Sequence, residues 1–93
     1  MPDLASLPNL GPASAQMLRA AGLSDVAQLR ALGAVRAFAQ VRRSQPQASL
    51  NLLWALEGAL TGLPWQQVAR EHRTSLLMAL EEHEYRSTKE SST

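Results

Sequence analysis

Hydrophobic residues recur along this chain every three or four positions, the spacing that gathers them on one face of an α-helix. No segment shows the alternation of apolar and polar residues that is typical of a half-buried β-strand. The pattern therefore predicts an all-α fold, a compact bundle of about five to six helices. Because no repeat or low-complexity block divides the chain, we expect one helical domain over residues 1–86. A polar tail over residues 87–93 is expected to be disordered.

Glycine, proline and short polar side chains mark where the helices begin and end. Gly22, Gly33 and Gly62 each follow an apolar stripe and predict the C-termini of three helices. Ser24 or Asp25 is expected to cap the N-terminus of the third helix. The expected helices span residues 3–6, 12–21, 26–32, 34–42, 50–61 and 65–84.

The segment from Leu50 to Leu60 is apolar almost all the way round a helix. A helix of this composition is buried on most of its sides, so we expect it to pack at the centre of the bundle, with Ser49 as its N-cap. The final helix carries a narrower apolar stripe that includes His72. We interpret His72 as a structural residue facing the core. His83 lies about 16 Å further along the same helix, too far to share a metal ion with it.

The stretch from Leu7 to Leu18 is typical of the turn and second helix of a helix-hairpin-helix unit. Two prolines prevent a continuous helix through the turn. Gly11 can adopt a positive φ, and Asn9 tolerates that region better than most residues. Pro12 suits the first turn of the helix that follows. Such a turn directs backbone N–H groups outward at a helix N-terminus, where an anion such as a nucleic-acid phosphate can bind.

The distribution of charge places any anion-binding surface in the first half of the chain. The net charge of +1 is too small to indicate nucleic-acid binding by itself. Residues 1–48, however, carry five arginines against two aspartates, whereas residues 49–93 carry four basic and six acidic residues. The two halves therefore have net charges of +3 and −2.

These features suggest weak, sequence-independent contact with the DNA backbone. The candidate residues are Asn9, Leu10, Gly11, Ala13, Ser14, Arg19, Arg42 and Arg43. Ala13 stands where DNA-binding turns often carry a basic residue, so a structural or protein-binding corner is the alternative interpretation of this turn.

The residue inventory argues against catalysis and metal binding. The chain contains no cysteine, which excludes disulfides and thiolate sites. No nucleophile-and-base constellation is apparent, so we predict no enzymatic activity, no catalytic residues, no metal site and no cofactor. The N-terminus has no signal-peptide pattern and no apolar run approaches about 18 residues. We therefore expect a cytoplasmic protein without a membrane partner.

Several segments resemble the C-terminal domain of the TfoX/Sxy competence regulators. They are Leu7–Leu18, Ala21–Leu23, Leu32–Val35, Ser49–Leu60 and Trp65, and the run from Leu50 to Leu60 is the most specific. The resemblance covers about residues 4–80. It implies an all-α, helix-hairpin-helix-like domain in a bacterial protein linked to competence gene expression and DNA uptake.

Full-length members of that family also carry an N-terminal α/β domain, which the sequence lacks, so we expect a stand-alone or excised C-terminal domain. The resemblance supplies no catalytic or cofactor residues.

We therefore expect a non-catalytic binding module linked to the regulation of DNA uptake and transformation, with DNA-backbone contact through the hairpin. The alternative is a protein-interaction or dimerisation module that does not contact DNA. A small domain that exposes a tryptophan should cover it against a partner. Trp54 and Trp65 are accordingly the candidate residues of a partner interface.

Overall fold

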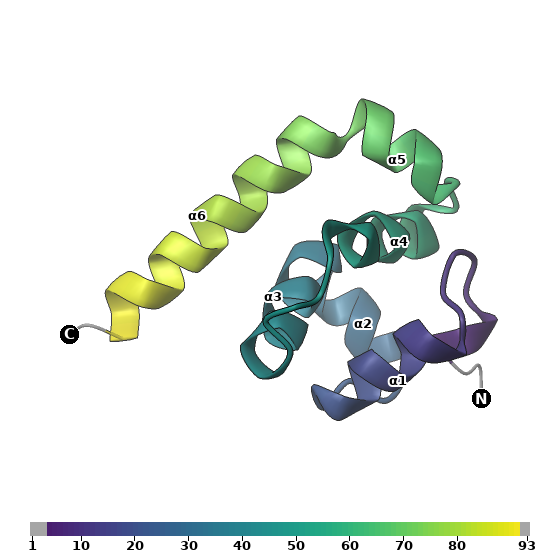
Figure 1. The fold of residues 1–93 in the computed structure, drawn as a ribbon, viewed down its shortest axis with the longest axis horizontal. Coiled ribbons are helices and arrows are strands. Elements are labelled where there is room, and N and C mark those ends of the chain that lie inside the picture. Colours follow the sequence, from purple (N-terminus) through teal and green to yellow (C-terminus); the bar gives the residue numbers. More distant parts are fainter. Residues whose placement is uncertain (1–3, 92–93) are drawn as a thin grey trace.

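The computed structural model describes the backbone of residues 4–91 and the side chains of residues 4–86 (Figure 1). Within this range every regular element is helical, which confirms the predicted all-α class. The elements are η1 (Leu4–Ser6, a 3₁₀ turn), α1 (Pro12–Ala20), α2 (Val26–Leu32), α3 (Ala34–Ser44), α4 (Leu50–Thr61), α5 (Trp65–Glu71) and α6 (Arg73–Ser91).

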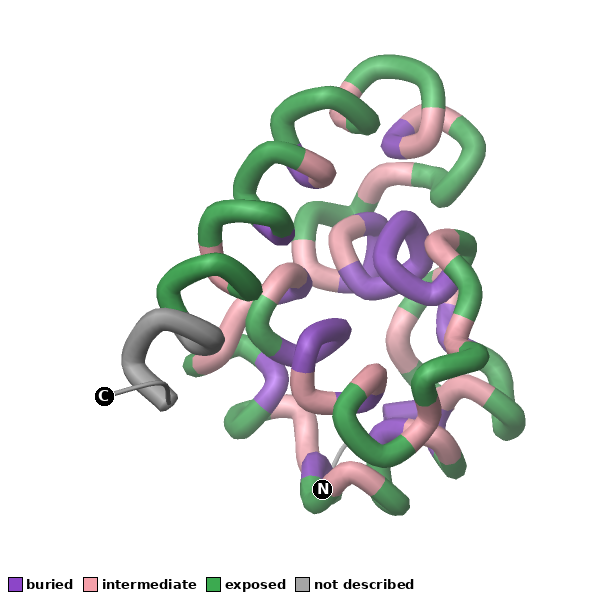
Figure 2. Tube along the Cα trace, turned by 60° about the vertical axis from the view of Figure 1, so that its left-hand side comes forward, coloured by how far each residue is buried: buried purple, intermediate pink, exposed green. Residues whose placement is uncertain are grey.

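Helix α4 lies at the centre of the domain and contacts both α3 and α5. Helix α3 in turn contacts α1, α2 and α6. Helices α5 and α6 form a bent arm that crosses the top of the view in Figure 1 and returns along α3. Helix α4 is buried almost all round, as predicted, whereas α6 is buried along one side only (Figure 2). The largest fully buried side chains are Leu4, Leu18, Leu29, Phe38, Val41, Leu53, Leu56 and Val68.

Helix α1 ends where Gly22 predicted it to end. The Gly22 N–H donates to the Arg19 carbonyl at 2.9 Å, and the Leu23 N–H donates to the Leu18 carbonyl at 2.9 Å. Gly22 has a φ of +91°. This is the Schellman arrangement, in which buried Leu18 and Leu23 supply the accompanying apolar contact.

The two predicted N-caps differ in how they act. At the start of α2, the Asp25 carboxylate accepts a hydrogen bond from the Gln28 amide at 2.8 Å. The Gln28 side chain accepts one from the Ser24 amide at 2.9 Å. This reciprocal pair resembles a capping box. Ser49 occupies the N-cap position of α4, but its side chain makes no capping hydrogen bond.

The single helix predicted over residues 65–84 is in fact two helices. Helix α5 ends before His72 and α6 begins after it, with His72 at φ −116° and ψ 4°. The His72 N–H still donates to the Val68 carbonyl, and its own carbonyl accepts from the Leu76 N–H. The break is therefore confined to one residue, and it allows α5 to pack on α4 while α6 packs on α3.

Helix α6 also extends further than the sequence predicted. It continues to Ser91, whereas residues 87–93 were expected to form a disordered tail. No glycine or proline interrupts residues 73–91, and an existing helix gains one hydrogen bond for each residue that it adds. Residues 92 and 93 lie outside the described range.

The turn between η1 and α1 is held against the loop between α4 and α5 by the side chain of Asn9. Its Nδ2 donates to the Leu63 carbonyl at 2.8 Å, and its Oδ1 accepts from the Trp65 amide at 3.1 Å. Asn9 has a φ of +69°, in the left-handed region. Gly11, which could also have adopted a positive φ, has φ −98° and serves as the N-cap of α1. The turn thus depends on Asn9 and not on Gly11 for its left-handed residue.

Docking of this turn requires a residue without a side chain at position 58. A Cβ atom on Gly58 would stand 2.5 Å from Asn9 Nδ2 and 2.6 Å from the Leu63 carbonyl oxygen. The Leu63 atom belongs to the backbone and cannot rotate away. Gly58 lies buried in α4, where glycine costs helix stability. Its value there is the close approach that it allows.

We predict that Gly58→Ala lowers the free energy of unfolding by about 1–3 kcal/mol, because the added methyl group overpacks the contact with Asn9 and Leu63. Gly11→Ala is the matched control, since nothing lies within 4 Å of a Cβ at that position. Its effect should stay below about 0.5 kcal/mol. Urea unfolding followed by circular dichroism measures both values. Equal stabilities of the two variants would contradict the role given to Gly58.

We also predict a pH-dependent cost for Asn9→Asp. This variant keeps the size of the side chain but places a carboxylate oxygen against the Leu63 carbonyl, so it should lose about 1–3 kcal/mol at pH 7. Protonation restores an O–H donor, so the folded state raises the pKa of the introduced carboxyl group. The loss should therefore shrink as the pH falls through that pKa. Urea unfolding at pH 7 and pH 4 tests this, with Asn9→Ala as a control whose cost should not change with pH.

Candidate functional site

The hairpin turn presents fewer of its side chains than the DNA-binding hypothesis assumed. The Asn9 side chain is engaged inside the protein by Leu63 and Trp65. Leu10 is buried and belongs to the core. Gly11 and Ala13 are exposed and Ser14 is half-buried. Of the candidate residues in the turn, only Gly11, Ala13 and Ser14 are therefore accessible to a ligand.

The donors that remain at the turn are backbone amides. The first N–H groups of a helix have no acceptor within the helix, and the N-cap residue Gly11 offers no side-chain oxygen to them. The chain contains no lysine or arginine before Arg19, so no basic side chain from the turn itself adjoins these amides. The turn can therefore offer hydrogen bonds and a helix dipole to an anion, but no formal positive charge of its own.

The candidate arginines lie apart from the hairpin turn. Helix α1 is about 13 Å long, and the turn is at its N-terminus. The C-terminal half of α3, which carries Arg42 and Arg43, is tied to the opposite end of α1. There Gln40 Nε2 donates to the Ala21 carbonyl at 2.7 Å, and Gln45 Nε2 donates to the Met17 carbonyl at 3.1 Å. Arg19 is exposed in the last turn of α1, at this same end.

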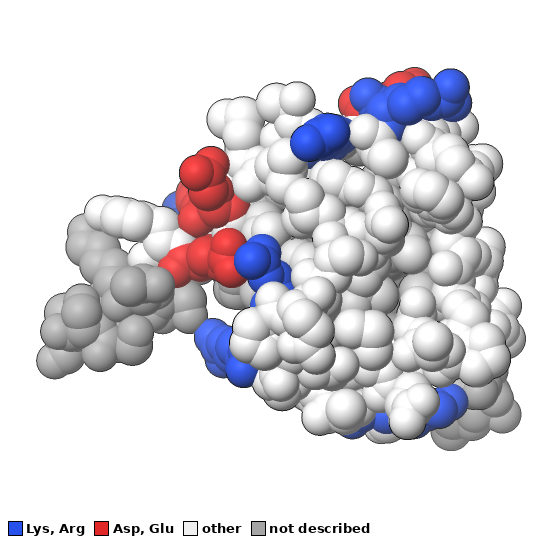
Figure 3. Space-filling view, viewed as in Figure 1, with Lys and Arg blue, Asp and Glu red and all other residues white. Residues whose placement is uncertain are grey.

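Arg42 and Arg43 also face different surroundings. The Arg42 guanidinium lies 5.5 Å from the centre of the Phe38 ring, and its Nη1 is 4.0 Å from Glu84 Oε2. Figure 3 shows acidic and basic side chains gathered toward the left margin of the view, on the side where α6 approaches α3. Arg43 instead lines a hollow between α3 and α6 that Arg42 does not line. The structure therefore does not combine the hairpin, Arg42 and Arg43 into one surface.

The two candidate tryptophans have opposite environments. Trp54 is only 5% exposed and forms part of the core, so its expected role in a partner interface is wrong. It is covered because α4 is buried on nearly all sides. Trp65, at the first position of α5, is 38% exposed. Met78 and Tyr85 on α6, which were not among the predicted interface residues, are more exposed still, at 64% and 67%.

A groove beside the hairpin turn brings together three of the candidate residues, Asn9, Ser14 and Trp65. Its volume is about 270 Å³. We call it the Trp65 groove, and it is lined by Asn9, Ser14, Met17, Ser49, Asn51, Leu52, Ala55 and Trp65. Apolar side chains from α1 and α4 alternate in it with amide and hydroxyl groups. This chemistry suits an apolar side chain flanked by hydrogen-bonding groups.

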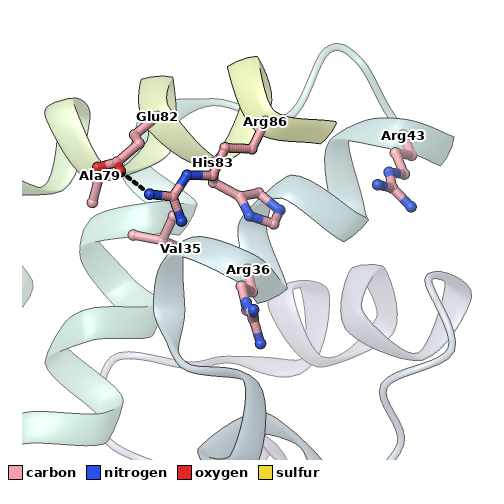
Figure 4. A pocket seen from close by; sticks show the side chains of 7 residues that line it. All are labelled: Val35, Arg36, Arg43, Ala79, Glu82, His83 and Arg86. Atoms are coloured by element: carbon pink, nitrogen blue, oxygen red, sulfur yellow. Dashed lines mark ion pairs between the residues drawn. The ribbon is translucent and has the colours of Figure 1, made fainter. Parts of the chain in front are cut away.

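A second groove of about 480 Å³ lies between α3 and α6 (Figure 4). We call it the basic groove, and it is lined by Val35, Arg36, Arg43, Ala79, Glu82, His83 and Arg86. In Figure 4 the His83 imidazole extends from α6 toward α3, and the dashed line joins Arg86 to Glu82 at 2.7 Å. Nothing in the sequence connects His83 or Arg86 with Arg36 and Arg43, because only the fold brings α6 against α3.

The described residues hold no group of three or more His, Asp or Glu side chains that could bind a metal ion.

His72 is half-buried, and its carbonyl accepts hydrogen bonds from the Leu76 amide and the Ser75 hydroxyl at the break between α5 and α6. No helix in the described part of the chain has the length and apolar character needed to cross a bilayer.

Comparison with known proteins identifies the family. The sequence matches the TfoX C-terminal domain over residues 1–80. It is 33% identical over 79 residues to the DNA transformation protein TfoX of Haemophilus influenzae. The match covers 85% of this chain and 36% of that protein, so the chain spans about a third of the length of this relative.

Two crystal structures from Listeria monocytogenes have the same fold. One, a triclinic form of an uncharacterised protein, superimposes with a TM-score of 0.77 at 28% identity and covers 89% of this chain and 94% of its own. The other, a tetragonal form of a protein of unknown function, has a TM-score of 0.74 at 29% identity and covers 81% and 93%. Because the family match spans most of the chain and the helical fold agrees with these structures, the chain belongs to the TfoX C-terminal domain family.

Proposed function

We propose that this chain is a non-catalytic, cytoplasmic binding module in the regulation of DNA uptake and transformation, and that it binds a protein partner in the Trp65 groove. The family match and the similarity to the Haemophilus influenzae DNA transformation protein support the biological context. The observation that carries the binding mode is Trp65, a large aromatic side chain left 38% exposed at a groove whose lining is part apolar and part polar. Exposed aromatic residues of this kind are enriched in protein interfaces.

The size and lining of the Trp65 groove favour a protein side chain over a small-molecule ligand. Its volume of about 270 Å³ falls below the roughly 300–1,000 Å³ of typical ligand pockets. Met17, Leu52 and Ala55 supply apolar surface, while Ser49 and Asn51 are exposed beside it. A partner could insert one apolar side chain and pair its backbone with the polar groups of the rim.

The absence of catalysis is supported by the environment of the polar groups. No polar or charged side chain is buried among the residues described by the structure. Active sites usually contain desolvated acids, bases or nucleophiles with perturbed pKa values. Binding through exposed groups is the activity that this surface chemistry favours.

DNA contact at the hairpin has less support and stays a prediction. The first-turn amides of α1 are the feature that favours it, since Gly11 and Ala13 beside them are exposed. A phosphate bound there should be repelled by Ala13→Glu, although a carboxylate at a helix N-terminus stabilises the helix itself. Titration of labelled duplex DNA at low salt tests this. Unchanged affinity in the variant would contradict binding at the turn.

A chimaera tests the proposed function directly. We predict that the Haemophilus influenzae TfoX protein supports transformation when its matching 79-residue segment is replaced by this chain. Trp65→Ala in the chimaera should reduce the transformation frequency by roughly tenfold or more, as expected when an interface loses an aromatic anchor worth about 2 kcal/mol. The hydrogen bond from the Trp65 amide to Asn9 involves only the backbone of Trp65, so the variant keeps this tie.

Tyr85→Ala is the matched control, because Tyr85 is a more exposed aromatic residue and does not line the Trp65 groove. It should leave transformation unchanged. Protein levels and melting temperatures verify that both variants are folded. A chimaera that does not support transformation would overturn the assigned context. Equal activities of the two variants would overturn the role of the groove. A stable dimer that dissociates with Trp65→Ala in sedimentation would identify a second copy of this chain as the occupant.

A further inference from the structure

The junction between α5 and α6, where the arm turns in Figure 1, is almost a continuous helix. The His72 N–H donates to the Val68 carbonyl at 2.9 Å, and the His72 carbonyl accepts from the Leu76 N–H at 3.0 Å. Two hydrogen bonds with helical spacing therefore already span the junction. The φ and ψ of His72, −116° and 4°, each differ by about 50° from those of a residue inside an α-helix. A change at this one residue would bring α5 and α6 into line.

The local sequence favours the straight form of this junction. Residues 65–91 contain no glycine or proline, and their apolar stripe predicts one helix over residues 65–84. A continuous helix also adds hydrogen bonds among the residues that flank the break, which the separate ends of two helices cannot make. The cause of the bend must therefore lie outside the junction.

The side chains at the junction do not fix the direction of the arm. Arg70, Glu71 and residues 73–75 are exposed, and His72 is half-buried. The Ser75 hydroxyl donates to the His72 carbonyl at 3.2 Å, but this bond joins residues only three positions apart. No distant element needs to give way when the junction straightens.

The contacts that keep α6 folded back lie farther along that helix. Leu76 and Leu80 are buried, α6 packs on α3, and Glu84 lies 4.0 Å from Arg42. These contacts depend on the surfaces of α3 and α6 and not on the connection between them, because they begin four residues beyond His72. The α6 helix of a second copy can make the same contacts.

We propose that two copies of this chain exchange α6 and form a dimer with twofold symmetry. In each copy His72 becomes helical, and residues 65–91 form one helix about 40 Å long whose α6 segment packs on α3 of the other copy. The exchange keeps the contacts of the bent arm and adds the hydrogen bonds of the continuous helix, which is how domain swapping produces dimers at low cost. The grooves between α3 and α6 then combine side chains from two copies.

This exchange is independent of the protein partner proposed above, since no residue that lines the Trp65 groove belongs to α3 or α6.

Cross-linking between two different variants tests the exchange. The chain has no cysteine, so Val35→Cys and Ala79→Cys each introduce a single thiol. Positions 35 and 79 line the same hollow from α3 and from α6 (Figure 4). The two full-length variants are mixed at high concentration, opened in mild urea, returned to buffer and treated with a short bis-maleimide. We expect a covalent dimer on a denaturing gel, because the exchange places one thiol of each copy in a shared hollow.

The control mixture contains Met78→Cys in place of Ala79→Cys. Met78 is exposed and lines a hollow formed by α6 residues alone. This mixture should give little covalent dimer, and circular dichroism melts should show that all three variants are folded.

A proline at position 73 tests the straight helix itself. Arg73 is the first residue of α6 in the bent arm, a position that tolerates proline. In the continuous helix the same residue is interior, where proline loses a hydrogen bond and clashes with the carbonyl four residues earlier. Arg73→Pro should therefore weaken the dimer by about a hundredfold or more in sedimentation. Arg73→Ala removes the same charge and should leave the dimer in place.

The proposal is overturned if the wild type sediments as a monomer at every concentration, or if the Met78→Cys mixture cross-links as well as the Ala79→Cys mixture. Equal dimerisation of Arg73→Pro and Arg73→Ala would also overturn it. Trp65→Ala should leave the exchanged dimer intact. A dimer that dissociates with Trp65→Ala and gives no cross-link between positions 35 and 79 would instead assign self-association to the Trp65 groove.

Discussion

Burial of α4 on nearly every side is the constraint on which the rest of this domain depends. Seven of its twelve residues are buried, so other elements must cover this helix along its whole length. Helices α3 and α5 contact it directly, and the N-terminal turn approaches it at Gly58. The surfaces left for binding are those that this arrangement does not use, which are the groove beside Trp65 and the groove between α3 and α6.

The parts of the fold that depend on near neighbours could be predicted from the sequence. The end of α1 at Gly22 and the cap of α2 at Asp25 rely on hydrogen bonds between residues at most five positions apart. The break at His72 could not be predicted in this way, since no glycine or proline marks it. The break lies where the chain passes from α5, which packs on α4, to α6, which packs on α3. These two packing contacts exist only in the folded domain.

The candidate site was predictable only in part, for the same reason. Residue type alone suggested Asn9 as a ligand contact, but its side chain meets two partners more than fifty residues away. Composition could not distinguish buried Trp54 from exposed Trp65. Arg42 and Arg43 are adjacent in sequence, yet successive residues of a helix point about 100° apart. One therefore meets Glu84, while the other lines the basic groove.

The Asn9 contact also has a consequence for the order of folding. Its two hydrogen bonds close loops of 54 and 56 residues, at an entropic cost of order 3.5 kcal/mol for a flexible chain. Two hydrogen bonds cannot offset that cost by themselves. Helices α3 and α4 must first pack and bring the α4–α5 loop within reach, so the N-terminal turn docks late on the folding pathway.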